Sequence, residues 1–274
     1  MKERRSVSIL MQAICVVCAL VLLFPILYAF STSLMQPADI LTTEYHLIPP
    51  TPTLANYRQA FTQTPIMRYM LNSFVVALIC STTRVILAAM AAFAFSFFEF
   101  RGKRILFALT LATIMIPPDV LVVQNYVTIS RLKLMNTYLG VCSIFLVSAN
   151  NIFLMRQNFL TFSKSLQEAA NLDGCSDVRF FCSILLPISK PVLITVFMNS
   201  FVSVWNQYVW PMLVTTRDEM RTVQVGITML KDRESSAFGP VMAGVMIALI
   251  PTILVFALFL RRIVAGMMTG AVKG

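Results

Sequence analysis

The sequence predicts an all-α polytopic membrane protein with six transmembrane helices. Of its 274 residues, 58% are hydrophobic and only 12% are charged, and its mean hydropathy is +0.78. Soluble domains are about 45–50% apolar and about 25% charged, so this chain carries about half the usual charge. Six windows are each apolar over the roughly 20 residues that a bilayer-spanning helix needs. This composition excludes a disordered chain, a coiled coil and a water-soluble nucleic-acid-binding protein.

The six windows are predicted as one helix each. The first, Ile9 to Phe30, is interpreted as an uncleaved helix, because it is longer than the apolar core of a secretory signal and no small-x-small cleavage site follows. Prolines interrupt the first, third and sixth windows, which membrane helices tolerate when neighbours satisfy the freed backbone groups. The other windows are 69–98, 105–126, 138–155, 191–214 and 239–260.

The distribution of charge predicts the orientation. With the N-terminus in the cytoplasm, most of the 22 lysines and arginines fall on the inner side, and so does almost all of the net charge of +10. Positive charge marks the cytoplasmic side of membrane proteins. We therefore expect both termini in the cytoplasm of a multi-pass protein of the inner or plasma membrane, in contact with lipid and not with nucleic acid. The expected parts are 1–68 (first helix and outer loop), 69–262 (transmembrane domain) and 263–274 (cytoplasmic tail).

The chain offers little for catalysis. It has one histidine, His46, which disfavours a histidine-based metal site and a catalytic triad. It has no phosphate-binding loop of the form G-x-x-x-x-G-K-[ST]. None of the six cysteines falls in a predicted outer loop, so free thiols are expected. We expect no metal, no catalytic residue and no cofactor bound by this chain, which favours a transporter over an enzyme.

A motif with defined spacing lies between the fourth and fifth windows. Glu-Ala-Ala is followed by three residues and a glycine, then by nine residues and Ile-x-Leu-Pro. Alanine and leucine favour a helix, and glycine is a typical helix stop. A short amphipathic helix that ends in a glycine turn is predicted, and proline then redirects the chain. The positions are Glu168, Ala169, Ala170, Gly174, Ile184, Leu186 and Pro187.

This motif resembles the EAA signature of the permease subunits of binding-protein-dependent ABC importers, and every fixed position matches. The resemblance covers most of the chain and implies the type I ABC importer permease fold. It also implies that the EAA helix docks on a separate ATP-binding subunit. Glu168 would contact this ATPase, Ala169 and Ala170 would permit close approach, and Gly174 would make the turn.

The resemblance further implies the partners. They are a second, homologous permease subunit, an ATP-binding cassette ATPase dimer that uses ATP and Mg²⁺, and an extracytoplasmic solute-binding protein. Closure of the ATPase dimer would pull the coupling helices together and alternate the access to a central cavity. A stand-alone secondary transporter or a membrane enzyme remains the alternative from another class.

The end of the fifth window resembles the carbohydrate-uptake branch of these permeases. The resemblance rests on the pattern Trp-Asn-x-Tyr-x-x-Pro over residues 205–211. Tryptophan and tyrosine also serve as anchors at membrane interfaces, so Trp205 has a purely structural interpretation. Asn206 and Gln207 are amides at membrane depth, which form interhelical hydrogen bonds or line a cavity. Both interpretations stay open.

Arg84 lies near the middle of the second window. An arginine at this depth costs about 2.5–3.5 kcal/mol on the translocon scale, and such residues face a cavity or a partner. The structural interpretation is an ion pair with Asp119, which follows Pro117-Pro118. The functional interpretation is attraction of an anionic substrate, because a guanidinium can bind phosphate through two hydrogen bonds.

Three features look most like the sn-glycerol-3-phosphate permease subunits of this family. They are the form Trp-Asn-Gln-Tyr-x-Trp-Pro, the stretch Arg179-Phe180-Phe181-Cys182 and the basic residue in the second window. The resemblance implies sn-glycerol 3-phosphate as the substrate. A neutral di- or oligosaccharide carried by the same machinery is the alternative.

Overall fold

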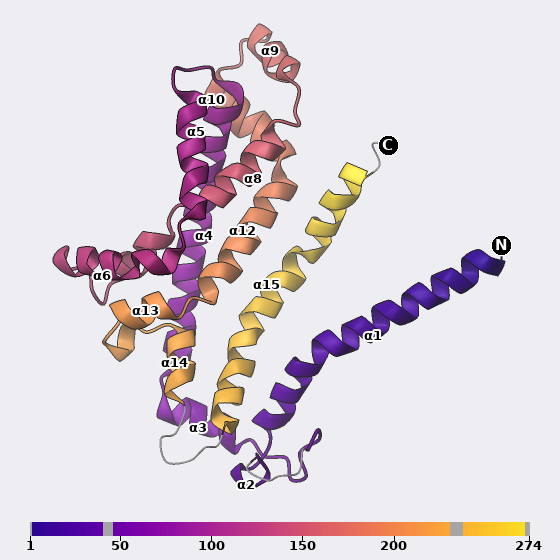
Figure 1. Ribbon diagram of the computed structural model, residues 1–274, viewed down its shortest axis with the longest axis vertical. Coiled ribbons are helices and arrows are strands. Elements are labelled where there is room, and N and C mark those ends of the chain that lie inside the picture. Colours follow the sequence, from indigo (N-terminus) through magenta and orange to yellow (C-terminus); the bar gives the residue numbers. More distant parts are fainter. Residues whose placement is uncertain (1, 41–45, 231–237, 272–274) are drawn as a thin grey trace. The chain divides into compact units, whose positions relative to one another are not determined.

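The computed structural model describes residues 2–40, 46–230 and 238–271, and within them the chain forms helices, turns and loops without a strand (Figure 1). The chain divides into two compact units. One contains residues 1–67 and 226–250, and the other contains residues 68–225 and 251–274.

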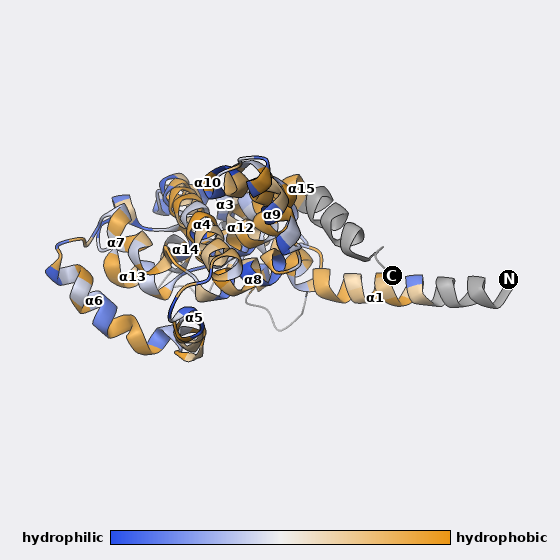
Figure 2. Ribbon diagram, turned by 90° about the horizontal axis from the view of Figure 1, so that it is seen from above, coloured by the Kyte–Doolittle hydropathy of each residue, from blue (hydrophilic) through white to orange (hydrophobic). Residues whose placement is uncertain are grey.

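Three helices are long and apolar enough to cross a membrane without a break. They are α1 (Lys2–Ser33), α4 (Ile66–Phe97) and α15 (Gly239–Ala271). Helices α1 and α15 continue through Pro25 and Pro251. In Figure 2, the described part of α1 is largely hydrophobic. These helices confirm the first, second and sixth predicted spans.

The other three predicted spans are each a pair of bent helical segments. The total reaches the predicted six spans when each bent pair counts as one span. The pairs are Lys103–Met115 with Pro118–Arg131, bent by 89°, Tyr138–Phe145 with Ala149–Phe159, bent by 51°, and Asp177–Ile188 with Lys190–Trp205, bent by 78°.

Adjacent prolines explain the sharpest bend. Proline has no amide hydrogen, and it forces the preceding residue out of the helical region. Ile116 and Pro117 accordingly have extended ψ angles of 115° and 128°. Helix α5 and its 3-10 extension end there, and α6 turns away with mixed hydrophilic and hydrophobic residues (Figure 2). The segments are α5 (Lys103–Ala112), η1 (Thr113–Met115), η2 (Pro118–Leu121) and α6 (Val122–Arg131).

The breaks within the fourth and fifth windows, before Ala149 and after Trp205, contain no proline. In the fourth, Ser148 caps the second segment by accepting a hydrogen bond from the Asn151 amide at 3.4 Å. In the fifth, the predicted helix 191–214 is interrupted after Trp205, where Asn206 caps the first segment. The segments are α7 (Tyr138–Cys142), η3 (Ser143–Phe145), α8 (Ala149–Phe159), α12 (Lys190–Trp205) and α13 (Val209–Val214).

Short helices make the connections. The EAA helix is α9 (Lys164–Leu172), and a π-helical turn, η4 (Phe181–Leu185), follows it. π-helical turns are rare and often mark functional segments. The others are α2 (Pro37–Ile40), α3 (Ala55–Gln63), α10 (Asp177–Phe180), α11 (Leu186–Ile188), η5 (Asp218–Met220) and α14 (Val223–Met229).

A phenylalanine cluster forms a core of the unit that contains residues 68–225. Its rings come from the end of α4, from α8 and from the segment after α9, and small side chains of α4 fill the space beside them. The Phe93 ring lies 4.9 Å from the Phe181 ring and 6.2 Å from the Phe180 ring, between centroids. The cluster therefore fixes the segment that follows the EAA helix to the end of α4. Its buried members include Ala88, Ala92, Phe93, Met155, Phe159, Ala170, Phe180 and Leu185.

In the other unit, a buried asparagine joins α1 to α3. The Asn56 Nδ2 group donates hydrogen bonds to the carbonyl oxygens of Ser33 at 2.9 Å and Met35 at 2.8 Å. The Ser33 hydroxyl also lies 2.8 Å from the Tyr57 hydroxyl. These bonds satisfy backbone carbonyls that the end of a helix leaves without partners.

Candidate functional site

The unit that contains residues 68–225 has an open cavity of about 520 Å³ beside the helix breaks. Its walls come from α4, from the Pro117-Pro118 break, from α6, from the break before α8, and from α12 and α13. Irregular backbone at membrane depth is tolerated where it lines a cavity. The polar lining includes Arg84, Asp119, Asn125, Ser148, Asn150, Ser203 and Gln207.

Arg84 reaches this cavity from the middle of α4. Its Nε donates a hydrogen bond to the carbonyl oxygen of Phe145, and its guanidinium carbon lies 5.9 Å from the centroid of the Phe145 ring. Phe145 is the last residue of η3, so its carbonyl is one of those that a helix end leaves for other donors. Among the described residues, nothing bonds to the two terminal guanidinium nitrogens. Arg84 therefore keeps both terminal nitrogens, with four N–H donors, for a ligand.

Asp119 lines the same cavity but does not pair with Arg84. The ion pairs between described residues lie elsewhere in the chain. The structural interpretation of Arg84, an ion pair with Asp119, is therefore wrong. A backbone carbonyl and an aromatic ring stabilise the half-buried cation in its place, and Asp119 remains exposed.

The structure places Trp205, Asn206 and Gln207 in different surroundings, and only Gln207 lines the cavity. Gln207 lines the cavity, and its Nε2 donates to the Ser203 carbonyl at 3.2 Å. Trp205 is 2% exposed and stacks on Phe201 at 5.9 Å between centroids, which fits its structural interpretation. Asn206 is exposed outside the cavity lining, and its Oδ1 accepts from Gln224 Nε2 at 3.4 Å.

Sequence reasoning missed other lining residues. Trp210 belongs to the cavity wall, and its Nε1 donates to the carbonyl oxygens of Gly140 at 3.3 Å and Val141 at 3.1 Å. These bonds hold α13 against α7. Asn125 and Asn150 were also missed. Each is an amide that follows closely after a helix break in an apolar window. A polar side chain at such a position could have indicated that it lines a cavity.

The predicted EAA helix and its glycine turn are confirmed as structure. The Ser163 hydroxyl caps the start of α9 by accepting from the Ser165 amide at 3.2 Å. Gly174 has a φ of +74°, a left-handed conformation that favours glycine. The Gly174 amide donates to the Asn171 carbonyl at 3.0 Å, which closes the turn.

The two alanines of the motif face different surroundings. Ala170 is 7% exposed and belongs to the phenylalanine cluster, whereas Ala169 is exposed. Glu168 is exposed, and Leu172 is 90% exposed at the end of the helix. Ala169 therefore offers a small side chain to the outside, while Ala170 lets α9 approach its own chain.

The second half of the motif holds the loop in place. Ile184 and Leu186 pack half-buried against the phenylalanine cluster. Pro187 is exposed beside the 78° bend that leads into α12. These three residues lie between the EAA helix and α12, on the segment that ends at this bend.

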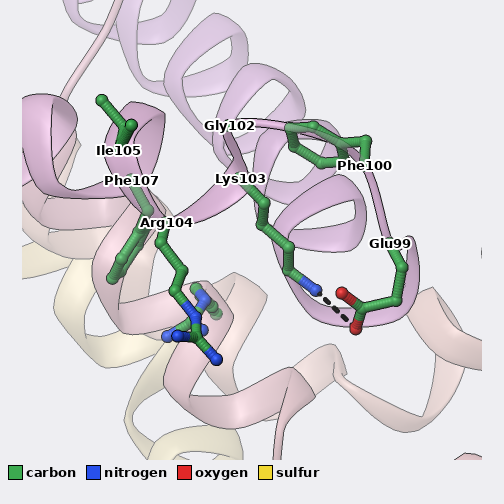
Figure 3. Close-up of a pocket in the computed structure, with 8 residues that line it drawn as sticks. Glu99, Phe100, Gly102, Lys103, Arg104, Ile105 and Phe107 are labelled. Carbon is green, nitrogen blue, oxygen red and sulfur yellow. Dashed lines mark hydrogen bonds and ion pairs between the residues drawn. The ribbon is translucent and has the colours of Figure 1, made fainter.

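A carboxylate connects the EAA helix to the turn before α5. Glu99 Oε1 lies 3.2 Å from Lys103 Nζ, as Figure 3 shows, and 3.7 Å from Lys164 Nζ at the start of α9. The hydrogen bond from Lys103 is the main reason that the pKa of Glu99 is lowered, and the positive charges of both lysines add to the effect.

The described residues contain no group of three or more His, Cys, Asp or Glu side chains that could hold a metal ion. The polar groups gather instead around the membrane cavity and on the EAA loop. The first arrangement suits the binding of a polar solute, and the second leaves one face of a short helix exposed.

Comparison with known proteins gives the family. Residues 84–268 match the family described as the binding-protein-dependent transport system inner membrane component. The sn-glycerol-3-phosphate transport system permease protein UgpE of Brucella abortus (strain 2308) is 34% identical over 277 residues, covering 97% of this chain and 98% of the relative. UgpE of Escherichia coli O1:K1 / APEC is 32% identical over 255 residues, covering 90% and 91%.

A solved structure has the same fold. It is a bacterial ABC transporter involved in the import of the acidic polysaccharide alginate, with a TM-score of 0.79 and 24% sequence identity over 95% of this chain and 98% of the other. The predicted all-α fold of a type I importer permease is confirmed. With the family match over most of the sequence, this chain belongs to the inner membrane components of binding-protein-dependent transport systems, the multi-pass permease subunits of ABC importers.

Proposed function

We propose that this chain forms one half of the translocation path of an ATP-driven importer for sn-glycerol 3-phosphate. The observation that carries the proposal is Arg84, a cation in a membrane-embedded cavity of about 520 Å³ with two uncommitted guanidinium nitrogens. Relatives about one third identical over nearly the whole chain are named for the transport of this substrate, which supports the choice.

The chemistry of the cavity matches both ends of this solute. A guanidinium presents its terminal nitrogens in a planar fork that binds two phosphate oxygens at once. The amides of Asn125, Asn150 and Gln207 can exchange hydrogen bonds with the two glycerol hydroxyls. A phosphate would also offset the cost of keeping Arg84 at membrane depth.

Coupling to ATP would run through the EAA helix. On this proposal, α9 docks on an ATPase subunit that binds ATP and Mg²⁺, and this chain hydrolyses nothing. Glu168, Ala169 and Leu172 lie on its exposed surface, and the corner at Pro187 transmits its displacement to α12. Rigid-body movement of packed helices then opens the cavity to one side of the membrane at a time.

The remaining parts follow from the orientation. Both termini and α9 would face the cytoplasm, where positive charge concentrates. The segment from Ser31 to about Pro65 would face the extracytoplasmic solute-binding protein. A second, homologous permease subunit would complete the cavity.

The test is uptake by the complete importer in proteoliposomes, with the binding protein outside and ATP inside. Radiolabelled sn-glycerol 3-phosphate should accumulate only with ATP and the binding protein, and unlabelled glycerol should not compete. Accumulation without ATP would indicate a secondary transporter and contradict the proposal.

A neutral di- or oligosaccharide is the second candidate. Trp210 favours it, because an aromatic side chain in the cavity wall beside several amides also suits a sugar ring. Uptake of a labelled disaccharide that sn-glycerol 3-phosphate does not inhibit would establish this candidate instead.

A further inference from the structure

A second pocket lies at the turn between α4 and α5, away from the transport cavity. It has a volume of about 650 Å³. Three basic side chains line it, those of Lys103, Arg104 and Arg156, against the single carboxylate of Glu99. The pocket therefore carries an excess of positive charge.

The carboxylate of Glu99 already forms ion pairs with two lysines. Glu99 pairs with Lys103 at 3.2 Å and with Lys164 at 3.7 Å. Lys103 Nζ also donates to the Phe98 carbonyl at 2.7 Å. Figure 3 shows the Lys103 side chain turned toward Glu99, while that of Arg104 extends away from this pair. The arginines are thus left without a negative partner.

The structure holds Arg156 in position without neutralising it. Its Nε donates to the Phe95 carbonyl at 3.3 Å, and its guanidinium carbon lies 4.1 Å from the centroid of the Phe107 ring. Within the ranges that the structure describes, neither Arg104 nor Arg156 forms an ion pair. Two cations that share a pocket repel each other, so an anion between them would be stabilising.

The surroundings indicate what kind of anion this is. The pocket lies where α4 ends, at Phe97, and α5 begins, at Lys103, which is the end of two membrane-embedded segments. The next turns of α5 expose apolar side chains, Ile105 at 67% and Leu109 at 59%. A ligand that covers both regions has an anionic head and a hydrocarbon tail. Basic pockets at the ends of membrane helices bind anionic lipid head groups in this way.

We propose that this pocket binds the phosphate of an anionic phospholipid, with the acyl chain along α5. Arg104 and Arg156 would hold the phosphate oxygens, and Ile105 and Leu109 would contact the chain. A free phosphate would leave the apolar face uncovered, so we commit to the lipid. The proposal depends on membrane insertion and is independent of the transported substrate.

The test measures lipid binding to the assembled, purified importer. Phosphatidylglycerol and, separately, phosphatidylcholine are titrated in, and the bound lipids are counted by native mass spectrometry. We expect tighter binding of phosphatidylglycerol. Arg104→Gln should weaken it about fivefold, the contribution of one basic residue near an anionic membrane surface, and Arg104→Lys should retain most of it.

Arg101→Gln is the matched control, because Arg101 is exposed on the same turn but does not line the pocket. Equal weakening by both glutamine variants, or no preference between the two lipids, would overturn the proposal. So would displacement of the lipid by millimolar inorganic phosphate, which would indicate a site for the free anion. A photo-crosslinker at position 104 should label lipid, and labelling of another subunit would instead reveal a protein interface.

Discussion

The guanidinium of Arg84 donates through Nε to the carbonyl oxygen of Phe145 and lies 5.9 Å from the centroid of the same residue's ring. Phe145 thus holds the half-buried Arg84 cation both by its backbone carbonyl and by its ring. The carbonyl is free because η3 ends at Phe145. The helix break therefore creates the acceptor that aims Arg84 into the cavity.

Replacing Asp119 by asparagine should leave the uptake of sn-glycerol 3-phosphate intact or increase it. Asp119 lines the cavity with Arg84 without pairing with it, so its charge repels a bound phosphate. Removing a unit charge a few ångströms away in a wet site is worth about 1 kcal/mol, or about fivefold. The measurement is the maximal uptake rate with saturating, loaded binding protein. A large loss would show that the carboxylate itself contributes to binding the solute, and would contradict this prediction.

Reversing the charge of Glu168 should uncouple transport. Glu168 is exposed on α9 and has no ion pair among the described residues. If it faces a complementary charge on the ATPase, Glu168→Lys places like charges together at a cost of several kcal/mol. Uptake should fall at least tenfold. Glu168→Gln, which removes the charge without reversing it, should lose less. Normal uptake by the lysine variant would refute the coupling role.

Leu172→Ser should weaken assembly with the ATPase. This side chain is 90% exposed in the isolated chain, and burying a leucine contributes about 1.5–3 kcal/mol. The affinity of the permease for the ATPase should therefore fall about tenfold or more in a binding measurement. Leu139→Ser, on α7, is the matched control because Leu139 is 63% exposed and outside the EAA loop. Equal losses in both variants would argue against docking through Leu172.

The ion pairs of Glu99 should make a small, pH-dependent contribution to stability. The pKa of Glu99 lies below its usual 4.5 in the folded chain, chiefly because of the hydrogen bond from Lys103. A lowered folded pKa gives stabilisation that is present above pH 4.5 and disappears as the pH falls through the folded value.

Thermal unfolding of the importer at a series of pH values checks this prediction. Glu99→Gln should lower the melting temperature slightly near pH 7, since exposed ion pairs contribute little, and the difference from wild type should vanish in acid. Glu219→Gln removes an exposed carboxylate that has no ion pair among the described residues and serves as the control. The same difference in melting temperature at every pH would contradict stabilisation by the Glu99 ion pairs.

Local signals in the sequence were enough for much of this structure. Apolar length located α1, α4 and α15, and the motif at residues 168–187 located a helix with a glycine turn. Pro117-Pro118 predicted a helix break, because proline lacks the amide hydrogen that a helix needs, whatever its surroundings. The family followed from the spacing of the same motif.

Other features depend on tertiary contacts that periodicity does not record. The break after Trp205 contains no proline within it. Ala169 and Ala170 are chemically identical, and only packing against the phenylalanine cluster distinguishes them. The acceptor for Arg84 is a backbone carbonyl, which no residue type identifies, so the sequence offered only Asp119 as a structural partner beside the substrate interpretation.

The most direct test of the proposed transport function is the uptake of sn-glycerol 3-phosphate by the reconstituted importer with Arg84→Gln. Hydrogen bonds to a charged group contribute about 1.5–3 kcal/mol each, so the maximal uptake rate should fall at least tenfold, while the complex assembles and retains its basal ATPase rate. Unchanged uptake would contradict a phosphate-binding role for Arg84, and a complex that fails to assemble would show that Arg84 is structural.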